Sequence, residues 1–263
     1  MSVLHERLPA NLRTTVQTSV CLALVCCAAH AQQPGFTSIT ARDVFTEYEA
    51  MESPLAEIAR ELDVVVAPRP FGRSGLSEAC MAFAVPTLQT SLAVSAVQTS
   101  AISLITPRVR YRFVPMDGYA MGLGARLDWM LIRGFENTVG LSADVSALMR
   151  IAEWTLAMGL DNAISLSGGR GPTLRMGLAR VIDSTDVMMD LVVRWDRPAS
   201  LRLALNLPLA ERLRTRMALA SGPITIAWSV RCGVSQTADM TLDIRHVVPL
   251  GMYTALTIAV QMP

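Results

Sequence analysis

The stretch that decides the fold reads MGLGARLDWMLI, residues 121–132. Its odd-numbered positions are all apolar, whereas its even-numbered positions include Gly122, Gly124, Arg126 and Asp128. Successive side chains of a β-strand point to opposite faces, so this segment has one apolar face and one small or polar face. The alternation predicts a β-strand with an apolar environment on one side only.

The same period of two continues to the end of the chain. It recurs in eight further stretches: 139–149, 154–161, 174–179, 186–196, 201–207, 224–234, 239–245 and 250–262. The predicted strands are roughly 8–12 residues long, close to the ~9–11 that a tilted strand needs to cross a bilayer. Turn signals separate them, for example Pro115-Met-Asp-Gly118 and Ser221-Gly-Pro223. With the less regular residues between Met81 and Phe113, the chain holds about 12–14 strands.

The composition supports a membrane barrel over a membrane helix. The chain is 51% hydrophobic with a mean hydropathy of +0.37. Past the first 31 residues, however, no uninterrupted apolar run reaches the ~18 residues of a spanning helix. Only helices and closed barrels satisfy their backbone groups in lipid. We therefore predict an all-β, antiparallel transmembrane barrel.

The first 31 residues have the features of a cleaved signal peptide. Arg7 and Arg13 lie in a polar region, an apolar run covers 20–29, and Ala29-His-Ala31 offers a small-x-small cleavage site. Cleavage after Ala31 predicts export, and with the strands it predicts a bacterial outer-membrane location. The remaining chain carries equal numbers of acidic and basic residues. This balance excludes nucleic-acid binding through a strongly basic surface.

Residues 32–75 have a different pattern and are treated as a separate segment before a barrel at 76–263. Ser53-Pro54 is a good helix start with Glu57 in the first turn, and Leu55, Ile58, Ala59 and Leu62 form one apolar stripe. We expect a short helix and loop that either plugs the barrel or forms a periplasmic tail. The stripe favours the plug.

Twelve charged residues occupy the polar phase of the predicted strands and are expected to face the lumen. They are Arg126, Asp128, Asp144, Asp161, Arg175, Asp190, Arg194, Arg202, Arg231, Asp239, Asp243 and Arg245. Two interpretations stay open: a selective polar channel, or a lattice of ion pairs that fills a narrow barrel. The many small inward residues favour the lattice.

Glycines and alternating apolar residues recur in seven stretches: 122–127, 132–135, 139–145, 154–162, 216–223, 241–246 and 249–251. These stretches resemble FadL-like outer-membrane barrels, and are closest to the PorV and PorQ type linked to type IX secretion. A FadL-like barrel implies passage of small apolar solutes through a lumen gated by the N-terminal segment. The PorV and PorQ type implies a non-transporting barrel that docks secreted client proteins or secretion-system components in the outer-membrane lipid. A soluble periplasmic β-sandwich is the remaining alternative, although it would have shorter strands.

No motif points to an enzyme, a metal site or a cofactor. His246 is the only histidine left after cleavage, and neither a Gly-x-Ser-x-Gly elbow nor a paired-histidine spacing is present. Cys80 and Cys232 could pair in an oxidising periplasm. Because Cys232 shares the apolar phase with Val230 and Val234, we favour free thiols.

Overall fold

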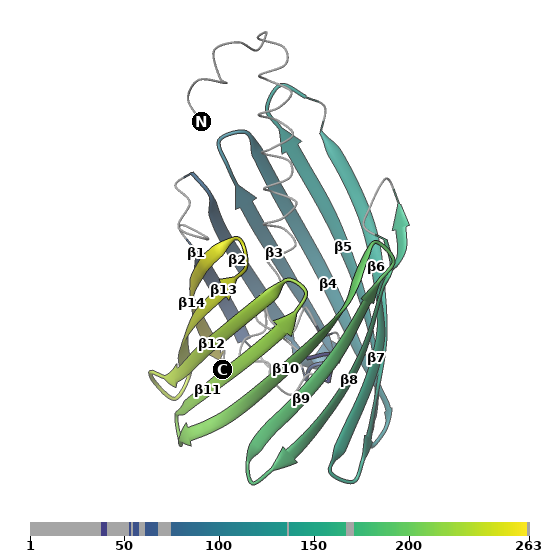
Figure 1. Cartoon of the computed structure of the whole chain (residues 1–263), viewed down its shortest axis with the longest axis vertical. Helices are drawn as coiled ribbons and strands as arrows, with labels where there is room; N and C mark the ends of the chain where they lie inside the picture. Colours follow the sequence, from purple (N-terminus) through teal and green to yellow (C-terminus); the bar gives the residue numbers. More distant parts are fainter. Residues whose placement is uncertain are drawn as a thin grey trace.

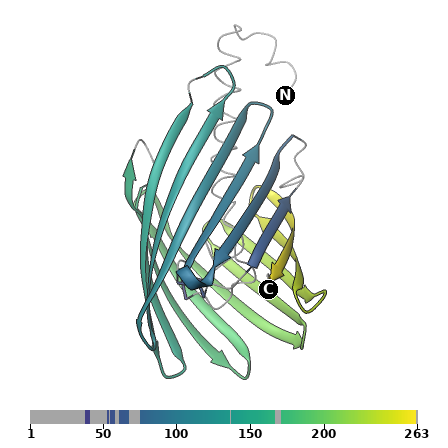
Figure 2. The same cartoon turned by 180° about the vertical axis from the view of Figure 1, so that it is seen from behind.

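In the part of the chain that the structure describes, fourteen antiparallel strands close into a barrel (Figures 1 and 2). This computed structural model describes residues 38–40, 53, 55–57, 61–67, 75–135, 137–166 and 171–261. The strands are β1 (Glu61–Ala67), β2 (Ser77–Val85), β3 (Thr90–Gln98), β4 (Ile102–Met116), β5 (Tyr119–Ile132), β6 (Thr138–Ile151), β7 (Trp154–Leu166), β8 (Thr173–Ile182), β9 (Thr185–Arg194), β10 (Arg197–Ala210), β11 (Leu213–Ser221), β12 (Ile224–Gly233), β13 (Ala238–Val247) and β14 (Gly251–Gln261). The closed ring confirms the predicted all-β barrel and excludes the sandwich, which would need two separate sheets.

The alternation in the sequence becomes an outer and an inner face. On β10, Leu201, Leu203 and Leu205 are 40–44% exposed, whereas the intervening Ala204 and Asn206 are 5–6% exposed. The exposed phase faces outward and is mostly apolar, and the buried phase faces the interior. The barrel thus has an apolar outer wall around a largely polar interior, which is the arrangement that a hydrocarbon surrounding requires.

The barrel begins fifteen positions earlier than the boundary at residue 76 predicted from the sequence, because β1 starts at Glu61 and belongs to the wall. Its Val64 and Val66 point outward, while Asp63 and Val65 are buried. Three consecutive valines hide this alternation in the sequence. Leu62, expected on a helical stripe, lies in this strand and pairs with Val260 and Phe83.

The described residues of the expected helix, Ser53 and 55–57, form a turn and irregular backbone. Pro54, Ile58 and Ala59 lie outside the described residues, as does the predicted signal peptide 1–31. Among the residues described, no helix is long and apolar enough to cross a membrane.

The wall has a tall side and a short side. Strands β4–β7 have 13–15 residues each and stand as the tall side in Figures 1 and 2. Strands β1–β3 and β11–β14 have 7–11 residues and make the short side.

The two mouths of the barrel differ in their connections. We call the mouth where β1 begins and β14 ends the terminal mouth. Four of its turns have two residues each: 117–118, 152–153, 183–184 and 211–212. The longest connections, 68–76, 133–137 and 167–172, all lie at the opposite mouth. Outer-membrane barrels have this asymmetry, with short periplasmic turns and longer extracellular loops.

Trp228 lies in the middle of an outward face, where an indole N–H would be costly to leave without an acceptor in hydrocarbon. The indole Nε1 donates a hydrogen bond of 2.8 Å to Thr215 Oγ1 on the neighbouring strand. The contact also covers Thr215, which is only 4% exposed although it lies on the outward phase of β11. Tryptophans of membrane barrels usually lie near the strand ends. The hydrogen bond to Thr215 explains how this one is accommodated in the middle of a strand.

A charge placed on the outward face tests this assignment. We expect Leu203→Arg, in the middle of β10, to lower the free energy of unfolding in lipid vesicles by about 2–4 kcal/mol. Gln98→Arg, on the outward face at the last position of β3, should lower the free energy of unfolding by only about 0–1 kcal/mol. Reversible unfolding of both variants in urea is the measurement, and equal costs would contradict an apolar surrounding for β10.

Candidate functional site in the barrel lumen

The interior of the barrel buries full charges. Arg110, Arg175 and Arg216 are among its largest buried side chains, each at most 2% exposed. A buried guanidinium is tolerated only with anionic or hydrogen-bonding partners. The partners of these three arginines therefore define the chemistry of the lumen.

One set of partners runs as a row across five strands. The row, hereafter the polar row, consists of Asp186, Asn206, Arg216, Ser229 and Asp243, which are successive neighbours in the register of β9–β13. Asn206 Nδ2 donates to Asp186 Oδ2 at 3.2 Å, and the guanidinium of Arg216 donates to Ser229 Oγ at 3.1 Å. Arg216 also lies 3.5 Å from Asp243, to which Ser229 donates. The row neutralises a buried arginine and ties five strands together.

Three of the twelve predicted site residues come together around Asn162 on β7. Arg126 forms an ion pair of 3.3 Å with Asp128 and donates to Asn162 Oδ1 at 2.6 Å. The backbone N–H of Asn162 donates to Asp144 Oδ1 at 2.7 Å. Asn162 adopts φ +55°, a left-handed conformation that asparagine tolerates, next to a register irregularity between β6 and β7. This irregularity turns Asn162 inward, so periodicity alone did not reveal it.

The other predicted residues lie in separate places. Arg175 pairs with Asp190 at 3.5 Å, and Arg231 pairs with Asp239. Arg245 stacks over Tyr253 at 4.9 Å, and the Tyr253 hydroxyl donates to buried Glu78 at 3.1 Å. Arg202 is the register neighbour of Asp190, Arg194 and Asp161 are both neighbours of Thr173, and Asp243 ends the polar row. The twelve residues thus form several local groups and no single cluster.

Sequence reasoning missed an arginine column on β4, formed by Arg108, Arg110 and Arg112. All three lie on the interior phase, and Gly124 and Gly122 stand opposite Arg110 and Arg112 in the register. The signal for this column is the alternation of charged and apolar residues in Arg108-Val-Arg-Tyr-Arg-Phe113. It lies at the end of the less regular stretch between Met81 and Phe113. Its outward partners, Val109, Tyr111 and Phe113, are 40–49% exposed.

A segment that precedes the wall docks inside the barrel through Asp190. The Ser38 hydroxyl donates to Asp190 Oδ1 at 2.7 Å, and the Ile39 backbone N–H donates to Asp190 Oδ2 at 2.8 Å. Ser38, Ile39 and Thr40 are 1–3% exposed. The carboxylate that pairs with Arg175 therefore also holds the N-terminal segment.

Two inward glycines make room for the Ile39 side chain. A methyl group at Gly177 would lie 2.3 Å from Ile39 Cγ2 and 2.6 Å from Asp190 Oδ1, and one at Gly159 would lie 2.7 Å from Ile39 Cδ1. Such distances are too short for real contacts, so Ile39 occupies space that a side chain at either position would take. We call Gly159, Gly177 and Asp190 the Ile39 cradle.

The arginine column supplies a second point of attachment. Arg110 donates to the carbonyl oxygen of Ser53 at 3.3 Å, and Arg112 donates to that of Leu55 at 3.1 Å. Ser53 Oγ donates to the carbonyl oxygen of Ile39 at 3.0 Å, which joins the two docked pieces. The side chains of Ile39 and Leu55 pack in one apolar cluster with interior residues of β5–β7: Ala120, Leu148 and Ala157.

The remaining chemical candidates lie apart from these groups. His246 is near the end of β13 on the outward phase. Cys80, which is buried, and Cys232, which is exposed, form no disulfide with each other. Within the described ranges, no group of three or more His, Cys, Asp or Glu residues is arranged to hold a metal ion. The best candidate for a functional site in the described part of the lumen is therefore the docked segment with its charged anchors.

Comparison with known proteins identifies similar solved structures but no family. No family model matches the chain, and no curated protein matches it. Outer membrane protein Omp33 of Acinetobacter baumannii superposes with a TM-score of 0.53 and 9% identity, over 78% of this chain and 99% of its own. The toluene transporter TbuX of Ralstonia pickettii gives 0.49 and 8%, over 81% and 92%, and a KdgM porin gives 0.47 and 6%, over 77% and 99%. The likeness to Omp33 shows a β-barrel fold shared with an outer membrane protein, whereas closeness to the PorV and PorQ type stays a prediction.

The Ile39 cradle can be tested by filling it. We expect Gly177→Ala to lower the free energy of unfolding by about 1–3 kcal/mol, the usual cost of overpacking. The added methyl should also displace the segment, so a thiol introduced by Ser38→Cys, in a Cys232→Ser background, should react faster with a maleimide. Gly171→Ala is the matched control, because nothing lies within 4 Å of its new methyl. An unchanged labelling rate in Gly177→Ala would show that the segment does not depend on the cradle.

Proposed function

We propose that this protein is an outer-membrane barrel that passes small solutes through a lumen closed by its own N-terminal segment. The observation that carries the proposal is the docking of Ser38 and Ile39 on Asp190 inside a barrel whose outer wall is apolar. The turn lengths favour a periplasmic terminal mouth and an extracellular opposite mouth. The strand lengths and the apolar wall support an outer-membrane location after export.

The way the segment is attached supports a closure that can be released. Ser38 and Ile39 contribute two hydrogen bonds to one carboxylate, and Arg110 and Arg112 contribute two to backbone carbonyls. Hydrogen bonds to a charged group contribute roughly 1.5–3 kcal/mol each. The four bonds together contribute roughly 6–12 kcal/mol, but all of them involve the segment, so its local release need not break any hydrogen bond of the closed wall.

The solute that best suits the interior is polar. The polar row and the arginine column line the described lumen with charges, and its described apolar residues are mostly small, such as Ala204, Ala218 and Ala227. Passage of small apolar solutes, as the FadL resemblance implies, would need an apolar route past these groups. We therefore propose polar solutes as the cargo.

A non-transporting barrel that docks secreted proteins is the second candidate. The paired Arg216 and Asp243, and the segment held at Asp190, fill the interior in the way that a docking barrel would allow. The two functions differ in conductance. Release of the segment should raise the conductance of a transporting barrel and leave that of a docking barrel unchanged.

Location is tested by separating inner and outer membranes and running the extracted protein on a denaturing gel. We expect it in the outer-membrane fraction, with a migration that changes on boiling, because a closed barrel resists the detergent until heated. Recovery in the soluble periplasmic fraction would refute the membrane proposal.

Gating is tested with Ile39→Asp, which changes the segment and leaves every wall residue intact. A carboxylate in the Ile39 cradle would face Asp190 without a cation of its own, so the segment should leave the lumen. We expect single-channel conductance in planar bilayers to rise from near zero to that of an open pore, or the open fraction to rise by at least about tenfold.

Asn137→Asp is the control, since it adds the same carboxylate at an exposed position of the 133–137 connection, outside the segment. A folded, heat-modifiable Ile39→Asp variant that conducts no more than the wild type would favour the docking barrel. A wild type that already conducts like the variant would refute closure by the segment.

A further inference from the structure

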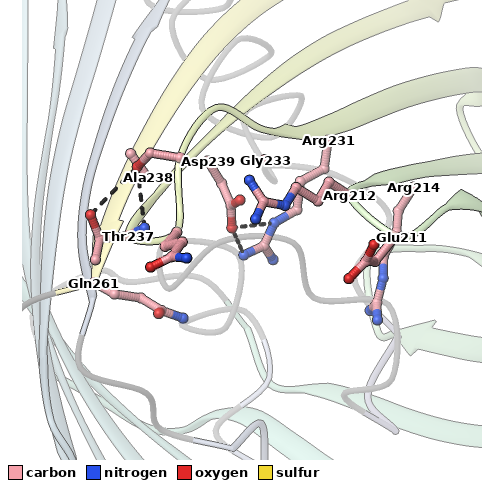
Figure 3. A pocket seen from close by; sticks show the side chains of 11 residues that line it. Glu211, Arg212, Arg214, Arg231, Gly233, Thr237, Ala238, Asp239 and Gln261 are labelled. Carbon is pink, nitrogen blue, oxygen red and sulfur yellow. Dashed lines mark hydrogen bonds and ion pairs between the residues drawn. The ribbon is translucent and has the colours of Figure 1, made fainter.

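A pocket of about 400 Å³ opens at the terminal mouth on the short side of the barrel. It lies between the 211–212 turn, the 234–237 connection and the end of β14 (Figure 3). Its charged lining consists of Glu211, Arg212, Arg214, Arg231 and Asp239. The described parts of the N-terminal segment contact β4–β9, so this pocket lies against a different part of the wall.

The pocket lining has three arginines but only two carboxylates, so its positive charge is not fully neutralised. Arg231 is engaged by Asp239, through both Nε and a terminal nitrogen. Arg214 stands directly opposite Arg231 in the β11–β12 register, where two like charges repel. The Arg214 side chain forms no hydrogen bond or ion pair with any residue that the structure describes. In Figure 3 it projects with Glu211 on one side of the pocket, and the Arg231–Asp239 pair lies on the other.

Arg212 is positioned by a glycine. The Cβ that Gly233 lacks would lie 3.2 Å from Arg212 Cβ and 3.4 Å from Arg212 Cδ. The Gly233 N–H donates to the Arg212 carbonyl oxygen at 2.9 Å. The aliphatic stem of Arg212 therefore lies across Gly233, which keeps its guanidinium in the pocket lining.

We propose that this pocket binds the carboxylate or phosphate group of a small solute through Arg212 and Arg214. A guanidinium presents paired N–H donors that match two oxygens of such a group, and bidentate pairing is stronger than a neutral hydrogen bond. Thr237 and Gln261 add side-chain donors in the same lining. With three arginines against the carboxylates of Glu211 and Asp239, the lining has a small positive net charge that suits a ligand with few negative charges.

A second pocket extends the site toward the polar row. It has a volume of about 470 Å³, shares Glu211 and Arg214 with the first, and adds Asp186 and Asn206. Arg214 thus belongs to both pockets, one at the mouth and one at the first residues of the polar row. The assignment of this anion site to the solute's path rests on the proposed transport function, but binding in the pocket does not.

The test is equilibrium binding to the purified, folded barrel in detergent, measured by calorimetry with succinate and, separately, with inorganic phosphate. At low ionic strength we expect a dissociation constant of roughly 0.1–10 mM for at least one of them. Arg214→Gln should weaken binding by at least about tenfold, and Arg212→Gln should weaken it measurably. A response to one probe alone identifies which anionic group the site takes.

Arg133→Gln is the matched control, because it removes one exposed arginine from a turn at the opposite mouth. Its affinity should equal that of the wild type. The proposal is overturned if neither probe binds below about 50 mM, if Arg214→Gln binds as well as the wild type, or if Arg133→Gln loses as much affinity. Since the readout is binding, a barrel that binds these anions without conducting would contradict transport and leave the anion site standing.

Discussion

A peptide N–H or C=O exposed to hydrocarbon must find its hydrogen bond within the protein, and the rest of this structure depends on that constraint. Here it is met by a ring of strands whose seam is the pairing of β1 with β14, from Glu61 opposite Gln261 to Val66 opposite Leu256. Once the ring is closed, side chains that alternate along each strand must divide into an outer and an inner set. Closure makes this division, and hydrocarbon around the wall requires the outer set to be the apolar one.

The inner set then faces its own constraint, because charges enclosed by the wall need partners. Arg216 finds them along the register in Ser229 and Asp243, whereas Arg110 and Arg112 donate to the backbone carbonyls of Ser53 and Leu55 inside the barrel. The first solution stabilises the wall, and the second makes the wall a receptor for the chain's own N-terminal segment. Interior arginines therefore serve stability on β11–β13 and docking on β4.

Most of the wall could be predicted from the sequence, because segments such as 224–234 alternate without interruption and are long enough to cross a bilayer. β1 could not, since Val64-Val65-Val66 shows no alternation by itself and becomes a strand only through pairing with β2 and β14. The arginine column could have been found in residues 108–113, where charged and apolar side chains alternate. The docking of Ile39 could not, because Ile39 and Asp190 are 151 positions apart and an inward glycine specifies only a small residue.

The position of Ser38 and Ile39 constrains how such a molecule can be assembled. These residues precede β1 in the chain, yet they lie inside a ring that is complete only when β14, the last strand, reaches β1. Either the wall wraps around a segment already in place, or the segment threads through a mouth after the seam has closed. In the first case the N-terminal segment acts as a template on which β8 and β9 are arranged. The barrel would then form with the segment already inside its lumen.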